Sequence, residues 1–150
     1  MKRIFIAVIL FAAIAIPSNG QNYPVIARES CDCFKKLKDT MEPEFRELII
    51  RVVKEKDIKA AFSKATESLP EAKREKFFQQ FGTIGSNMDS EETETGRCAL
   101  SIAEKYDYEK YKNDPSLSKE FTTKLSEEMR KNKNCELLAA IFLYALAMSE

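Results

Sequence analysis

Four cysteines carry the most definite chemistry in this sequence: Cys31, Cys33, Cys98 and Cys135. Residues two apart on a helix point about 200° away from each other, so Cys31 and Cys33 should not bond to each other. Two pairings remain: 31 with 98 and 33 with 135, or 31 with 135 and 33 with 98. The sequence leaves both open. We favour the second, because Cys33 faces the predicted core, whereas a sideways Cys31 can reach Cys135 at the start of the last helix.

We expect these cysteines to form structural disulfides. Redox-active dithiols usually occur as C-x-x-C, which places both sulfur atoms on one side of a helix start. A four-cysteine zinc site usually contains two C-x2-C pairs. In this chain only Cys31 and Cys33 are close in sequence, and their spacing is C-x-C. An even number of cysteines in an exported protein is typical of disulfide cross-links.

No residue pattern indicates catalysis. Histidine is absent, which excludes Ser-His-Asp and Cys-His arrangements. The segment 82–86 contains two glycines, but a phosphate-binding loop needs a lysine after the second glycine and a strand before the first. Adjacent carboxylates at 91–92 and 127–128 lie on polar faces, where solvated charge is the norm. We therefore expect no enzyme activity, no catalytic residue, no cofactor and no metal.

Two groups of aromatic residues are candidate contact sites. Tyr108 and Tyr111 follow the predicted fifth helix, and exposed tyrosines are good anchors for a protein partner. The second group could line a site for a small apolar ligand or lipid, and it comprises Phe77, Phe78, Phe81, Phe142 and Tyr144. Such stripes are more often plain core.

The hydroxyl of Tyr144 is a separate question, because this residue lies inside an otherwise apolar stretch. A buried hydroxyl needs a partner, so we expect it to bond to a backbone carbonyl.

The N-terminus has the order of a secretory signal peptide. Lys2 and Arg3 precede an apolar run over 4–16, and small residues follow at Ser18 and Gly20. We expect cleavage after Gly20, a single domain over 21–150, and a secreted or periplasmic location. Loss of the two basic residues leaves 22 basic and 24 acidic side chains, a net charge of −2. Nucleic acid is then not an expected partner.

The last apolar stretch, Leu137–Met148, contains twelve residues without a charge. A bilayer-spanning helix needs roughly 18 to 20 such residues. The length therefore predicts a buried helix at the centre of a bundle, and no membrane span once the signal peptide is removed.

Apolar residues at helical spacing predict an all-α fold, a single compact bundle of six or seven short helices cross-linked by disulfides. No long run alternates with the period of a strand. The predicted helices cover 26–41, 43–53, 58–69, 71–88, 91–106, 117–129 and 135–148. The second and third could be one bent helix, and the fourth could end at Gly82. Predicted caps are Asp57, a box of Ser68 with Glu71, Asp89 or Ser90, and Asn134.

Two classes of function agree with these features. The first is a protein-interaction module such as an inhibitor, an immunity-type protein or an envelope assembly factor. The second is a carrier that holds a small apolar ligand or lipid in the bundle. We rank the module first, because the sequence combines balanced charge with a cross-linked scaffold and no catalytic pattern.

Overall fold

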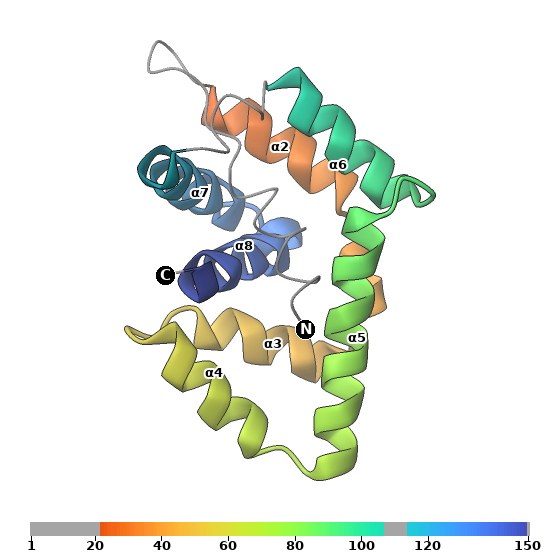
Figure 1. Ribbon diagram of the computed structural model, residues 1–150, viewed down its shortest axis with the longest axis vertical. Coiled ribbons are helices and arrows are strands. Elements are labelled where there is room, and N and C mark those ends of the chain that lie inside the picture. Colours follow the sequence, from red (N-terminus) through yellow and green to blue (C-terminus); the bar gives the residue numbers. More distant parts are fainter. Residues whose placement is uncertain (1–21, 107–113, 150) are drawn as a thin grey trace.

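The computed structural model describes residues 22–106 and 114–149, and within them the chain is helical with no strand. The elements are α2 (Tyr23–Cys33), η1 (Leu37–Thr40), α3 (Pro43–Val52), α4 (Ile58–Glu67), α5 (Glu71–Asp89), α6 (Glu94–Lys105), α7 (Pro115–Arg130), η3 (Lys133–Cys135) and α8 (Glu136–Ser149). They pack as one compact bundle (Figure 1). The predicted all-α bundle is confirmed.

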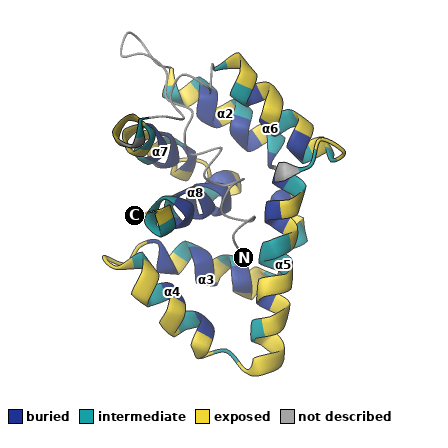
Figure 2. Ribbon diagram, viewed as in Figure 1, coloured by how far each residue is buried: buried dark blue, intermediate teal, exposed yellow. Residues whose placement is uncertain are grey.

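Helix α8 occupies the centre of the bundle, between α7 on one side and α3 on the other (Figure 1). Its length and apolar composition explain this position, since a helix that is hydrophobic all round is stable only when it is covered all round. Figure 2 shows α8 mostly buried, whereas α4 and the first turns of α5 are mostly exposed. The buried residues of α8 are Leu137, Leu138, Ala139, Ala140, Ile141, Phe142, Tyr144 and Ala145. The predicted central C-terminal helix is confirmed.

Helix α5 runs past both of its glycines to Asp89, so the predicted alternative end at Gly82 is wrong. Each glycine costs roughly 1 kcal/mol in a helix interior. Beyond Gly82, Ile84 and Met88 are 1% and 3% exposed. Burial of two such side chains contributes about 3 to 6 kcal/mol, which exceeds the glycine cost.

The caps were predicted with mixed success. The Asp57 carboxylate accepts a hydrogen bond from the Ala60 amide at 3.0 Å, as predicted. The box of Ser68 and Glu71 is wrong, because Pro70 occupies the cap position and the Ser68 hydroxyl donates backwards to a carbonyl of α4. Thr93 caps α6, instead of Asp89 or Ser90. Asn132, not Asn134, caps the turn before α8.

The segment 26–41 is not one helix. Helix α2 ends at Cys33, and Phe34 and Leu37 are buried in the turn and 3-10 helix that follow. Cys31 therefore belongs to the buried stripe of α2 and is 8% exposed, whereas Cys33 is only partly buried. This reverses the predicted orientation of the two cysteines.

Two disulfides leave the end of α2. Cys31 bonds to Cys135 with a Cα–Cα distance of 5.4 Å, and Cys33 bonds to Cys98 with a Cα–Cα distance of 5.7 Å. Both distances are normal for disulfides. The favoured pairing is therefore confirmed. The side-chain orientations on which it was based are wrong, because Cys31 and not Cys33 faces the core. No cysteine is free.

Candidate interaction surface

Phe62 of α4 is the centre of an aromatic cluster that joins three helices. Its ring centroid lies 4.4 Å from that of Tyr144 in α8 and 5.8 to 6.4 Å from those of Phe77, Phe78 and Phe81 in α5. Phe81 also contacts Tyr144 edge to face at 5.5 Å. These separations are typical of favourable aromatic pairs. Phe62 was not among the residues predicted to line an apolar ligand site.

Phe77 and Phe78 occupy opposite environments because consecutive helix residues point about 100° apart. Phe77 is fully buried and meets Phe45 edge to face at 5.4 Å. Phe78 is 48% exposed, yet its ring contacts Phe77 at 5.3 Å and Phe62 at 6.4 Å. The cluster therefore continues from the core to solvent. We call Phe62, Phe78, Phe81 and Tyr144 the aromatic surface, in which Phe78 is exposed, Phe81 is partly buried, and Phe62 and Tyr144 lie beneath at 7% exposure.

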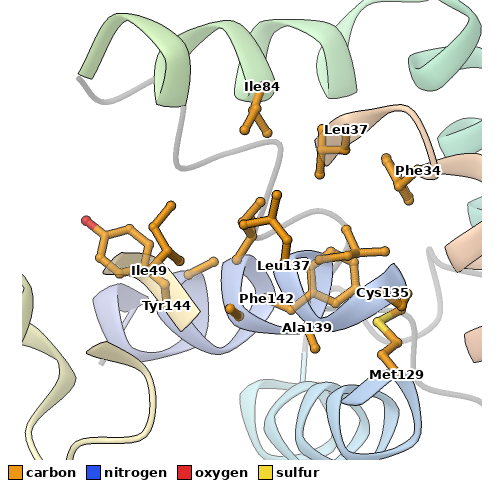
Figure 3. Packing of buried hydrophobic residues seen from close by; sticks show 14 of the residues in the cluster. Phe34, Leu37, Ile49, Ile84, Met129, Cys135, Leu137, Ala139, Phe142 and Tyr144 are labelled. Carbon is orange, nitrogen blue, oxygen red and sulfur yellow. The ribbon is translucent and has the colours of Figure 1, made fainter. Parts of the chain in front are cut away.

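Phe142 and Tyr144 both come from α8, and both belong to the packed core (Figure 3). Phe142 is 0% exposed and Tyr144 is 7% exposed. The Tyr144 hydroxyl points away from Phe142 (Figure 3) and forms no hydrogen bond with another described residue, so the predicted bond to a backbone carbonyl is not found. Burial raises the pKa of Tyr144 to about 12, so the phenol is neutral at physiological pH.

Two open hollows lie on the described part of the chain, away from the aromatic surface. One, of about 350 Å³, is lined by residues that include Met41, Arg46 and Gln80. The other, of about 220 Å³, is lined by residues that include Arg46, Lys133 and Leu137. Neither includes any of the five residues predicted to line an apolar ligand site. Phe77, Phe78, Phe81 and Tyr144 contact other rings instead.

The predicted partner contacts Tyr108 and Tyr111 lie outside the described residues. Their neighbour Tyr106 is partly buried, and its hydroxyl donates to Glu29 of α2 at 2.9 Å. Lys105 donates to both oxygens of the same carboxylate at 2.7 and 2.8 Å. The hydrogen bonds from Lys105 and then Tyr106 hold the pKa of Glu29 below its usual value. Tyr106 thus ties α6 to α2.

The segment 51–76, which contains Phe62 and precedes Phe78 in the chain, carries many charged residues. Residues 51–76 contain eight lysines and arginines and five acidic residues. Three of the lysines form ion pairs that stay within the bundle: Lys54 with Glu136, Lys73 with Glu44, and Lys76 with Glu42. The other five basic residues and the five acidic residues form no ion pair with a described residue, so the unpaired charge of this segment is balanced. The five basic residues are Arg51, Lys56, Lys59, Lys64 and Arg74. Arg74 precedes Phe78 by one helical turn and lies on the same side of α5.

Within residues 22–106 and 114–149, no three cysteine or carboxylate side chains gather as metal ligands would. None of the helices in these ranges is long and apolar enough to cross a membrane. The two disulfides are consistent with an extracellular or otherwise oxidising location.

Comparison of the chain with protein-family models, with curated proteins and with solved structures found no match.

Proposed function

We propose that this protein is an exported protein-interaction module without enzyme activity, and that a partner protein docks on the aromatic surface. The observation that carries the proposal is the exposure of Phe78 at the edge of a continuous aromatic cluster. A large exposed aromatic side chain held by its neighbours loses little conformational entropy on binding. Such residues are frequent hot spots in protein interfaces.

The proposed occupant is an amphipathic helix of another protein, with its apolar face against Phe78. An amphipathic helix is a common partner for an exposed apolar anchor, because its apolar face offers side chains three and four residues apart. A partner of this kind agrees with an inhibitor, an immunity-type protein or an assembly factor.

The first test is site-specific photocrosslinking in the organism that makes the protein. A crosslinking residue at position 78 should capture one protein, and the same residue at exposed position 101 of α6 should not. The captured protein is then purified and its affinity measured by calorimetry. Phe78→Ser should weaken binding by about 30-fold, the size of a 2 kcal/mol hot spot.

Leu100→Ser is the matched control, because Leu100 is a similarly exposed apolar residue (42%) on a different helix. This variant should bind as the original protein does. Equal affinities of all three proteins would contradict the proposal. Binding to vesicles of anionic lipid that depends on Phe78, or a copurifying lipid-sized mass, would replace it with a membrane or carrier role.

A further inference from the structure

The two disulfides differ in their accessibility to a reductant. Cys31 and Cys135 are 8% and 1% exposed, whereas Cys33 and Cys98 are both only partly buried. Thiol–disulfide exchange requires a thiolate to approach one sulfur atom, so its rate depends on access. A reagent in solution therefore meets the Cys33–Cys98 bond first.

Helix α6, which carries Cys98, has few other attachments. Its buried residues are Gly96, Ala99 and Ile102, of which Ile102 alone is large. Helix α7, in contrast, buries Phe121, Leu125 and Met129 to 1% exposure or less. The hydrophobic stabilisation of α6 is therefore smaller than that of α7, because it grows with the apolar area that is buried.

The polar contacts of α6 with α2 lie near the surface. Lys36 pairs with Glu94 at 2.8 Å, with both side chains at least two-thirds exposed, and Lys105 pairs with Glu29. Ion pairs near the surface contribute little to stability, because water and salt screen them. The covalent bond thus supplies a large part of the attachment of α6.

We infer that Cys33–Cys98 is a selectively reducible cross-link, and that its reduction releases α6 while Cys31–Cys135 keeps the rest of the bundle folded. The 104-residue separation of Cys31 and Cys135 encloses the whole of the smaller loop closed by Cys33 and Cys98. The remaining disulfide therefore still constrains α3 to α5. This inference does not depend on the identity of any partner.

The reaction needs an external dithiol. One thiolate of the dithiol attacks Cys33 or Cys98, forms a mixed disulfide and expels the other protein sulfur as a thiolate, which takes up a proton. The second thiol of the reagent then displaces the attached protein sulfur. Two electrons pass to the protein, two cysteine thiols form, and the reagent leaves as a cyclic disulfide.

The experiment treats the folded mature chain with increasing dithiothreitol, traps free thiols with iodoacetamide and locates the label by mass spectrometry. A species with two labels, on Cys33 and Cys98, should form at least about tenfold faster than the four-label species, because access limits the second exchange. Hydrogen exchange of that species should show loss of protection in α6 and retained protection in α7. In denaturant, the two disulfides should be reduced at similar rates.

The double variant C33S/C98S reproduces the reduced state without a reagent. It should keep the protection of α7 and lose that of α6. The inference would be overturned if Cys31 and Cys135 were labelled first, or if all four cysteines were labelled together. It would also be overturned if the hydrogen-exchange protection of α6 did not change, or if the double variant did not fold.

Discussion

Gly96 is a position in α6 where the packing leaves no room for a side chain. A Cβ atom added there would lie 2.7 Å from the carbonyl carbon of Ser90 and closer still to its oxygen. The same few residues form the helix start, since the Thr93 hydroxyl accepts from the Gly96 amide at 2.9 Å and donates to the Asn87 and Ser90 carbonyls. The absent side chain lets α6 begin directly after α5.

Gly96→Ala should therefore destabilise the protein by about 1 to 3 kcal/mol, the usual range for overpacking. The better helix propensity of alanine offsets this by at most about 1 kcal/mol. Urea unfolding with intact disulfides measures the change in free energy. Ser101→Ala, at an exposed position of the same helix, is the control and should change stability little. A stabilised Gly96→Ala variant would show that Ser90 can move away.

At the scale of elements, α2 and α6 are joined by a disulfide and by a small polar network. Glu29 of α2 accepts hydrogen bonds from Lys105 and Tyr106 of α6. These bonds hold the pKa of Glu29 below its usual value of 4.5. A carboxylate of this kind stabilises the folded state above its unfolded pKa, and the contribution disappears as the pH falls through the lower folded pKa.

Glu29→Gln should therefore lower stability at pH 7 by about 0.2 to 1 kcal/mol, the range for largely exposed pairs. The difference should shrink as the pH falls through the lowered pKa of Glu29, because the carboxylate then becomes protonated in the folded state as well. Urea unfolding at pH 7 and pH 3 measures both differences. Glu104→Gln on the exposed side of α6 should show no such dependence. Equal losses at both pH values would contradict an ionic role for Glu29.

At the scale of the whole molecule, one segment anchors both cross-links. Cys31 and Cys33 are two residues apart, and their partners are 104 and 65 residues further along the chain. The loop closed by Cys31 and Cys135 contains η1, η3 and all helices from α3 to α7. It leaves out α8 and most of α2. A disulfide of this span typically contributes about 2 to 5 kcal/mol, and the contribution grows only slowly with loop length.

Cys33→Ser and Cys98→Ser should lower the melting temperature in oxidising buffer by similar amounts, and the double variant should be no less stable than either. Each removes the same cross-link, worth about 2 to 5 kcal/mol. Calorimetry without reductant measures the three transitions. Melting temperatures equal to that of the original protein would contradict a stabilising role. Clearly different single variants would indicate that the freed thiol exchanges with Cys31–Cys135.

Composition and periodicity were sufficient for the helical class, for the central position of Leu137–Met148 and for the exclusion of a Cys31–Cys33 bond. These features depend on long apolar runs and on local geometry, both of which the sequence displays. The cap of α6 was missed because Asp89 and Ser90 have a higher intrinsic cap tendency than Thr93. Burial of Ile84 and Met88 extends α5 to Asp89, so that Thr93 is the residue in position to cap α6.

The candidate site was only partly predictable for a related reason. The phenylalanines of α5 were identified as candidate site residues. Their periodicity did not show which of them lie on the side of α5 that faces α4. Phe78 is exposed and Phe77 is buried because of where α3 and α4 lie, which is a tertiary property. Phe62 is flanked by small residues in α4, so its sequence context resembles ordinary core.

The common anchor of the two disulfides also determines what happens when a protease cuts the chain. A single cut between Cys33 and Cys98 leaves pieces that the Cys33–Cys98 bond still joins. A single cut between Cys98 and Cys135 leaves pieces joined by Cys31–Cys135. The exposed lysines in the turn between α3 and α4 are natural cleavage points. Cleavage there would nick the protein without separating the pieces, so both would remain parts of one covalent molecule.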